Sequence, residues 1–435
     1  MLVATRCRYN LVPAELARMR STSTVTIHLP SIAHNMSVIR DLVGPQCGVC
    51  AVVKADGYGL GAPRVAQQLA ASGASMLAVY SVAQAEAIAE AGVALPMLVL
   101  MPVRSIEPGG AAHRLIITGR LHFTAHSLAH ARDLAELAES VGGGALPIHV
   151  EVDTGMSRGG MHADEAARTI ASIADDRRLR LAGVFTHFSE SRLDPAGTAA
   201  QLAEFETLLV RCADSIPSDA AIHASNSHAV MLGGPFHKSM VRVGIAWTGL
   251  AETEEYPSFG ASLEGVLSWT SSIVHTKEIR VGAPVGYGSR WRADAQTRVA
   301  VVPVGYFDGY PMGGASGRDR FVSVEWETPA GVQSRDAMVL GAVNMDQIVI
   351  DITSIPPSLS HAEGFVGMRV EVYGRDRARP NFLPRVAEAV GAHAYELLCR
   401  IHPRIPRQIV AMPTLAGCDE VARSAPIAVA GAIAS

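Results

Sequence analysis

The feature that most constrains the fold is an alternation of two patterns between about residues 25 and 250, where short apolar runs alternate with Ala-, Leu- and Glu-rich stretches. The clearest of these stretches cover residues 81–91, 127–139 and 163–174, and they have helical periodicity and few helix breakers. Residues 104–120 look least helical. The predicted strands are 48–53, 76–79, 97–100, 122–124, 148–152, 181–186, 221–224 and 241–246. Eight strand–helix units predict an α/β fold, a parallel (β/α)8 barrel of the TIM type.

The pattern changes after about residue 252, where Val-, Gly- and Pro-rich runs replace the helical stretches. These runs predict a mostly antiparallel β domain with one late helix near 384–390. The β runs are 266–274, 298–304, 321–326, 337–340, 347–352 and 368–372. The predicted organisation is a flexible extension (1–25), a barrel (26–255), a C-terminal β domain (256–414) and a loose tail (415–435).

Charge and hydropathy exclude several classes of partner. The net charge of −4 predicts no nucleic acid and no anionic membrane surface as a partner. No apolar run reaches the ~18 residues of a membrane helix. The N-terminal stretch scatters arginines among its apolar residues, unlike a secretory signal. A presequence of the mitochondrial type stays open, but we favour a flexible extension and a cytoplasmic protein.

The six cysteines are too sparse for a disulfide framework. Cys47 and Cys50 form a C-G-V-C that superficially resembles a redox motif. Because this motif leads directly into an apolar strand, we interpret both residues as structural thiols. No cluster of Cys and His has zinc spacing, and no metal site is predicted.

Candidate functional residues stand within or just after five of the eight predicted strands, toward their carboxyl ends. They are Lys54 and Tyr58, then Glu151 and Arg158, then His187, then Ser227, and finally Arg242, Gly244 and Ile245. A barrel enzyme keeps its active site at these strand ends. Each residue alone has an ordinary explanation, such as a surface lysine, an ion-paired arginine or a structural histidine. Together they predict an anion site, because cations that converge without a ligand would cost several kcal/mol.

A phosphate group fits the last two loops best. Barrels often bind phosphate after strands seven and eight. Ser227 offers a hydroxyl there, and Gly244 and Ile245 offer backbone amides. Glycine allows a ligand to approach the backbone closely, and free amides attract anions.

A series of motifs resembles one known family. A-V-V-K-A-D-G-Y-G-L-G is similar to the pyridoxal 5′-phosphate (PLP) lysine signature of alanine racemases. The family's other motifs follow in order over residues 25–407: V-D-T-G-M-S-R-G-G, T-H-F, N-S, R-V-G-I, V-G-Y-G, V-G-Y-F-D-G, M-D-Q and Y-E-L-L-C-R-I-x-P-R-I-P-R. The resemblance implies a PLP-dependent isomerase that interconverts L- and D-alanine, with a small amino acid as substrate.

The resemblance also implies two catalytic bases. Lys54 would bind the cofactor as a Schiff base and act on one face of the substrate, and a neighbouring cation or desolvation would lower its pKa. Tyr287 would act on the other face, from the β domain of the partner chain. A tyrosine with the usual pKa of ~10 needs help to act as a base. A homodimer with shared active sites follows.

Arg242 and His187 match the residues that would assist these bases. By resemblance, Arg242 faces the pyridine nitrogen of the cofactor. His187 would hydrogen-bond Tyr287, and Arg242 would be the next member of this chain of hydrogen bonds. A guanidinium keeps its proton, so the ring nitrogen would stay unprotonated. The ring would then withdraw electrons less strongly, which favours simple return of a proton over transamination.

The remaining matches concern the phosphate and the substrate. The phosphate-binding positions are Tyr58, Ser227, Gly244, Ile245 and Tyr395. Tyr395 should also crowd the substrate side chain. Arg158 matches an arginine near the cofactor's ring hydroxyl and the substrate carboxylate. Met345 and Tyr306, with Asp346 beside them, match positions that the partner chain contributes at the substrate carboxylate or at the way into the site.

Some positions depart from the family pattern. Glu151 stands where many members have a lysine, often carbamylated, and we expect it to orient Arg158 through a charge-assisted pair. Leu60, Asn344 and the pair Trp247–Thr248 also differ, which leaves the fine substrate preference open.

Three other readings stay open. A racemase for serine or for a broader set of amino acids is one, a decarboxylase of the same layout is another, and a non-catalytic PLP carrier is the third. Tyr395 argues for a small side chain, and the V-G-Y-G context of Tyr287 argues against a decarboxylase. The long β-rich region argues against the carrier. Both supply of D-alanine and breakdown of alanine fit the sequence.

Overall fold

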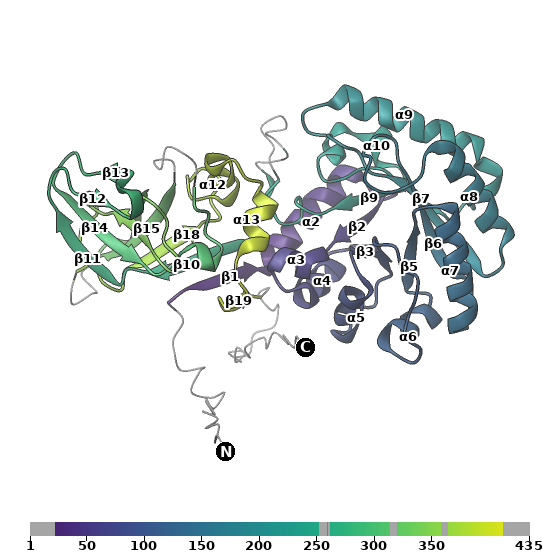
Figure 1. Ribbon diagram of the computed structural model, residues 1–435, viewed down its shortest axis with the longest axis horizontal. Helices are drawn as coiled ribbons and strands as arrows, with labels where there is room; N and C mark the ends of the chain where they lie inside the picture. The colour runs from purple at the N-terminus through teal and green to yellow at the C-terminus, as the bar shows by residue number, and fades with distance from the viewer. Residues whose placement is uncertain (1–21, 252–258, 260–261, 314–319, 358–363, 412–435) are drawn as a thin grey trace, which may run out of the picture.

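The computed structural model describes residues 22–251, 259, 262–313, 320–357 and 364–411. It has two parts, a parallel barrel surrounded by helices and a second domain built mainly of antiparallel strands (Figure 1). The predicted fold class is therefore confirmed. The predicted tail and most of the predicted extension lie outside the described residues.

All eight predicted barrel strands are present, and every neighbouring pair in the sheet is parallel. They are β2 (Gly48–Val52), β3 (Met76–Val79), β4 (Met97–Val99), β5 (Leu121–Ala125), β6 (Leu146–Val152), β7 (Leu179–Thr186), β8 (Ala221–His223) and β9 (Met240–Val243). The sheet order is β8-β7-β6-β5-β4-β3-β2-β9. The amide of Arg242 donates to the carbonyl of Ser225 at 2.9 Å, which joins the two ends of this sheet.

The helices pack their apolar faces against these strands (Figure 1). They are α2 (Leu29–Val43), α3 (Lys54–Gly59), α4 (Ala62–Ala71), α5 (Val82–Glu90), α6 (Ala111–Ile117), α7 (Leu128–Val141), α8 (Ala163–Asp175), α9 (Pro195–Arg211) and the short α10 (Gly234–His237). α7 begins after Ser127, whose hydroxyl accepts from the amide of His130 at 3.0 Å. None of the described helices is both long and apolar enough to cross a membrane.

The second domain contains the six predicted β runs and further strands. Its main sheet has the order β11 (His275–Ile279), β14 (Thr297–Val302), β17 (Ile348–Asp351), β16 (Gly331–Leu340), β15 (Phe321–Thr328), β18 (Arg369–Tyr373), β10 (Leu267–Ser272), β1 (Thr24–His28) and β19 (Arg407–Val410). Short strands β12 (Pro284–Val285) and β13 (Trp291–Arg292) form a separate pair. Neighbouring strands are antiparallel except for β1 and β19.

The N-terminal strand β1 joins this second sheet and not the barrel. Val25 pairs with Trp269 of β10 and with Arg407 of β19. The predicted start of the barrel at residue 26 did not anticipate this pairing, because a five-residue strand contains no sign of its partner. Both ends of the described chain are thereby fixed in one sheet.

The second domain has two helices near the barrel, and α13 (Ala394–Arg400) reaches it. The sequence predicted α12 (Leu383–Val390) but not α13. α13 lies beside α3 (Figure 1). The guanidinium of Arg407 donates to the carbonyl of Gly59 at 3.3 Å and to the carbonyl of Ile401 at 2.8 Å, which ties this part of the second domain to α3. Tyr395 on α13 is thereby held at the mouth of the barrel.

The C-G-V-C motif has no redox geometry. Cys50 is buried inside the barrel and Cys47 is half-buried, and both are free thiols. Burial raises the pKa of Cys50 to about 12, so its reactive thiolate form is suppressed. This supports the interpretation as structural thiols.

Candidate active site

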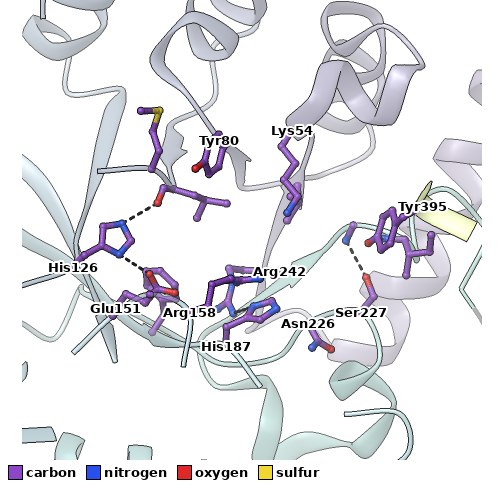
Figure 2. A pocket seen from close by; sticks show the side chains of 18 of the residues that line it. Lys54, Tyr80, His126, Glu151, Arg158, His187, Asn226, Ser227, Arg242 and Tyr395 are labelled. Atoms are coloured by element: carbon purple, nitrogen blue, oxygen red, sulfur yellow. Dashed lines mark hydrogen bonds and ion pairs between the residues drawn. The ribbon is translucent and has the colours of Figure 1, made fainter. Parts of the chain in front are cut away.

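A cavity of about 710 Å³ opens at the carboxyl ends of the barrel strands. It brings together every residue that the sequence predicted from the barrel and from α13. These are Lys54, Tyr58, Glu151, Arg158, His187, Ser227, Arg242, Gly244, Ile245 and Tyr395 (Figure 2). All but Tyr395 come from five strand ends, separated by up to about 190 residues in the sequence, and Tyr395 comes from α13.

A left-handed turn orients Lys54. The residue stands two positions after the end of β2, and the next four residues, from Ala55 to Tyr58, have φ between 53° and 61°. Left-handed backbone costs about 1 kcal/mol or more for each non-glycine residue, so the surroundings must hold the turn in place. Asp56 does so, because its carboxylate accepts from the amide of Ala62 at 2.8 Å. The turn lets Lys54 point into the cavity while Tyr58 is buried next to it (Figure 2).

The surroundings of Lys54 favour its uncharged form. Desolvation by the cavity walls is the largest cause that lowers the pKa of the amine, and the charge of Arg158 lowers it further. Cys399 has the opposite, smaller effect. A larger fraction of the amine is therefore neutral, which is the form that attacks an aldehyde.

Arg242 is buried below the cavity, and hydrogen bonds from both terminal nitrogens of its guanidinium hold it in place. Its guanidinium donates to the carbonyl of Thr186 at 2.7 Å, to the carbonyl of His223 at 3.0 Å and to Nδ1 of His187 at 3.3 Å. Burial lowers the pKa of Arg242 to about 10, and the group is still a cation at neutral pH. Burial and the charge of Arg242 lower the pKa of His187 to about 3. Because Nδ1 of His187 accepts, its ring proton lies on Nε2.

A row of buried histidines continues from Arg242 across the barrel interior. Nδ1 of His223 lies 3.0 Å from the guanidinium, Nδ1 of His149 lies 2.9 Å from Nε2 of His223, and Nδ1 of His122 lies 2.9 Å from Nε2 of His149. A guanidinium can only donate, so each ring must accept at Nδ1 and donate at Nε2. Burial lowers the pKa of His122 to about 4 and those of His149 and His223 well below the usual range. The row is therefore uncharged at neutral pH.

Hydroxyl groups and backbone amides gather at the other end of the cavity. Ser227 Oγ accepts from the amide of Gly244 at 2.9 Å, and the hydroxyl of Tyr395 accepts from the amide of Ile245 at 2.5 Å. The sequence predicted free amides here, and the structure corrects this: both amides are bonded to hydroxyls, because a buried amide needs a partner. The hydroxyl protons of Ser227 and Tyr395 remain able to donate to an anion.

Gly244 is required by the close packing of this cluster. A Cβ at this position would lie 2.3 Å from the Tyr58 hydroxyl and 2.7 Å from the Tyr395 hydroxyl. The two tyrosine rings lie 4.9 Å apart between centroids. Burial raises the pKa of Tyr395 to about 12 and that of Tyr58 well above its usual range, so both phenols stay protonated and can donate.

Glu151 has a different partner from the expected one. Its carboxylate pairs with Nδ1 of His126 at 2.8 Å, and within the described part of the chain it forms no ion pair with Arg158. The expected Glu151–Arg158 pair is therefore wrong, because His126 at the end of β5 is the nearer cation. The loop with Arg158 is instead held by Asp153, whose carboxylate accepts from the amides of Gly155 and Ser157 at 3.0 Å.

The four site residues predicted from the β domain do not line this cavity. Tyr287, Tyr306, Met345 and Asp346 lie on the surface of the second domain, and Tyr287 is 79% exposed. Tyr287 directly follows β12, which lies at the end of the second domain that points away from the barrel (Figure 1). Their loops adjoin each other, since the amide of Tyr306 donates to the carbonyl of Asn344 at 3.0 Å and Gly286 packs against Ala342.

Comparison with known proteins agrees with this geometry. Residues 27–252 match the family described as "Alanine racemase, N-terminal domain", and residues 266–409 match "Alanine racemase, C-terminal domain". The chain belongs to the alanine racemase family. The match covers both the barrel with its cavity and the second domain.

Individual relatives support the same assignment. An alanine racemase of Laribacter hongkongensis is 33% identical over 88% of this chain and 98% of its own length. The crystal structure of a Bacillus anthracis alanine racemase with bound L-Ala-P has a TM-score of 0.73 and 25% identity, and the match covers 90% of this chain and 95% of that one. A Bartonella henselae alanine racemase with covalently bound pyridoxal phosphate has the same fold, with a TM-score of 0.72 at 23% identity and coverage of 90% and 100%.

Two residues that line the cavity and the row of buried histidines were not predicted from the sequence. Tyr80 directly follows β3 and His126 directly follows β5, and both line the cavity. The rule that found Lys54 and His187 also applies to them, because they stand at the carboxyl ends of barrel strands. The histidine row had no such signal, because its members stand within strands like ordinary core residues.

Apart from Glu151, three of the departures from the family pattern, Trp247, Leu60 and Asn344, lie away from the cavity. Trp247 is fully buried behind Tyr58, with 5.6 Å between ring centroids, and its Nε1 donates to the carbonyl of Val52 at 2.9 Å. It thus supports the strand that precedes Lys54. Leu60 is a core residue, and Asn344 lies in the second domain. None of the three lines the cavity of its own chain.

Proposed function

We propose that this protein interconverts L- and D-alanine by a two-base mechanism, with Lys54 on one face of the substrate and Tyr287 of the partner subunit on the other. As a member of its family it is an amino-acid isomerase, and its cofactor is PLP. The observation that supports the proposal most is the content of the cavity: one lysine with a lowered pKa, a fixed arginine below it and a hydroxyl cluster at one end.

The residues present fit the cofactor. Lys54 offers an amine for its aldehyde, and Arg242 offers a fixed donor for its ring nitrogen. Ser227, Tyr395 and the segment around Gly244 form a cradle for its phosphate, and a Cβ on Gly244 would fill that cradle. When bound, PLP supplies the electron-withdrawing ring that makes the Cα proton of alanine acidic.

The chain's own residues then move the proton. On one face the neutral amine of Lys54 takes up the Cα proton, and its ammonium form returns one. On the opposite face Tyr287 of the partner subunit takes up the proton as a phenolate and returns one as a phenol. His187 donates from Nε2 to that phenolate oxygen, because its Nδ1 already accepts from Arg242. A hydrogen bond donated to the phenolate oxygen favours that charged form, which is the form that takes up the proton.

A homodimer would explain the surface of the second domain. Among the described residues of this domain, five exposed side chains are aromatic or methionine: Tyr287, Tyr306, Phe307, Met312 and Met345. Aromatic residues and methionine are enriched in protein interfaces, and clusters of exposed apolar residues mark them. Three of the five are predicted site positions, so one contact between two chains would both cover this surface and complete the site.

The test combines a chiral assay with a variant. We expect purified holoenzyme to form D-alanine from L-alanine faster than it forms D-serine or D-lysine from their L forms. Lys54→Ala should abolish both this activity and the visible absorbance of lysine-bound cofactor. Faster turnover of serine or lysine would contradict the substrate, and an unchanged visible band in the variant would contradict the role of Lys54.

A further inference from the structure

The side of the cavity formed by β5 and β6 contains an ion pair that the proposed reaction does not use. His126 Nδ1 lies 2.8 Å from Glu151 Oε2, and the two side chains are only 17% and 11% exposed. The other ring nitrogen of His126, Nε2, lies 2.9 Å from the carbonyl oxygen of Leu100. Figure 2 shows both contacts on one wall of the cavity.

The partners of His126 determine the charge of this pair. A carbonyl oxygen can only accept a hydrogen bond, and an ionised carboxylate can only accept as well. Nε2 of His126 must therefore donate to Leu100, and a proton on Nδ1 as well makes the 2.8 Å contact with Glu151 a charge-assisted pair. The neighbouring ring of His130 has its own partner, because its Nε2 lies 2.9 Å from the carbonyl of Val103. The pair has no net charge and leaves none of the carboxylate's charge for Arg158.

The loop that contains Arg158 is packed directly on this pair. A Cβ on Gly159 would lie 3.1 Å from Oε2 of Glu151 and 3.5 Å from Nδ1 of His126. The amide of Met161 donates to the backbone carbonyl of Glu151 at 3.0 Å, which fixes the far end of the loop. Arg158 is therefore the neighbour in sequence of Gly159, which packs on the Glu151 carboxylate, but among the described residues the ion-pair partner of Glu151 is His126.

We propose that His126 is a positioning residue: by neutralising Glu151, it keeps the guanidinium of Arg158 available for the carboxylate of the substrate. This inference rests on the proposed function as an amino-acid racemase. An uncompensated Glu151 would draw Arg158 toward itself and repel the substrate's carboxylate. Both effects would weaken substrate binding more than they would slow proton transfer.

The decisive variant is His126→Asn, which keeps an amide donor beside Glu151 but cannot hold a positive charge. We expect the KM for alanine to rise roughly tenfold, the order expected of one uncompensated charge at a partly buried site, while kcat changes by less than about threefold. The double variant His126→Asn/Glu151→Gln removes the uncompensated charge as well. Its KM should return to within about threefold of the wild-type value.

The matched control is His130→Asn, which removes the adjacent neutral ring, 5.9 Å from His126 between centroids. We expect its KM to stay near the wild-type value. The proposal is overturned if His126→Asn leaves KM unchanged, or if the double variant is no better than the single one. Melting temperature and cofactor absorbance of each holoenzyme show that the variants are folded. His126→Gln replaces His126→Asn, and His130→Gln replaces His130→Asn, if the asparagine variant is not folded.

A binding measurement separates this inference from the proposed reaction. Propionate has the carboxylate of alanine without its amine, and calorimetry on holoenzyme should show the same weakening in His126→Asn and the same recovery in the double variant. If alanine is not racemised but propionate follows this pattern, the proposed function fails and the role of His126 stands. If alanine is racemised and neither KM nor propionate affinity changes, the role of His126 fails.

Discussion

Single residues of the cavity owe their chemistry to what surrounds them. Burial is the largest cause that lowers the pKa of Lys54, and the positive charge of Arg158 lowers it further. Arg242 keeps its charge although it is buried, because carbonyl and imidazole acceptors surround it. The same residue types elsewhere in the chain form ordinary surface pairs, such as Arg104 with Asp133.

The lowered pKa of Lys54 can be tested by removing one of its causes. Arg158→Gln removes a neighbouring positive charge, which makes protonation of Lys54 easier and raises its pKa toward the usual value. The rate at which apoenzyme binds PLP covalently should then fall at pH 7, by several-fold, and its rise with pH should shift to higher pH. Arg104→Gln, outside the cavity, is the control, and an identical pH profile for both variants would refute the effect.

The cradle around Gly244 makes a second prediction at this scale. Gly244→Ala would place a methyl group 2.3 Å from the Tyr58 hydroxyl, so one of the two tyrosines must move. We expect the affinity of apoenzyme for PLP to fall at least about tenfold, measured by absorbance titration. Gly144→Ala is the control, because nothing lies within 4 Å of its Cβ. Wild-type PLP affinity in Gly244→Ala would contradict the cradle.

At the scale of elements, the histidine row connects three barrel strands, β5, β6 and β8, to the guanidinium on β9. Each ring satisfies the next, so the row fills the barrel interior without a charge or an orphaned donor. Its energetic consequence appears at acidic pH. Below pH ~6.5 the unfolded chain protonates these rings while the folded chain does not.

Folding stability should therefore fall as pH decreases from about 6.5 toward 4, by up to about 1.4 kcal/mol per pH unit for each buried histidine. The variant His122→Gln keeps an acceptor for His149 and removes one titrating ring. Its free energy of unfolding in urea should decline less steeply over this range than that of the wild type. His275→Gln, on the exposed strand β11, should decline like the wild type. Equal slopes for the wild type and His122→Gln would contradict the row's neutral state.

The sequence predicted elements well where periodicity is long or apolar runs are continuous. All eight barrel strands were recognised because parallel strands are buried on both faces. The helix α6 was uncertain because it has only seven residues after two glycines, and packing of Leu115 and Ile116 decides its formation. The partner of Glu151 could not be predicted, because His126 and Glu151 stand on different strands and meet only in the folded barrel.

At the scale of the whole molecule, the second domain has two roles. Its helix α13 brings Tyr395 to the cavity of its own chain, while its surface around Tyr287 lies far from that cavity. The resemblance to the family implied a contribution from Tyr395 and one from Tyr287. The motifs alone could not show that Tyr395 lies in the cavity of its own chain while Tyr287 lies far from it. If the site is completed only by a second chain, activity requires the dimer.

Dilution tests this requirement. Specific activity should fall as the protein concentration drops below the dimer dissociation constant, in parallel with the dimer fraction from analytical ultracentrifugation. Met345→Lys places a charge on the exposed apolar surface and should shift both curves to higher concentration. Val332→Lys, an exposed apolar residue on β16 away from the predicted site positions, is the control. Full specific activity of a monomer would contradict a shared site.

The most direct measurement mixes two inactive proteins, Lys54→Ala and Tyr287→Phe, under conditions where subunits exchange. Each mixed dimer would have one site with both Lys54 and Tyr287, and random exchange makes about half of the dimers mixed. We therefore expect the mixture to recover about one quarter of wild-type alanine racemisation. No recovery, with exchange verified by differently tagged chains, would contradict the claim that the two bases come from different subunits.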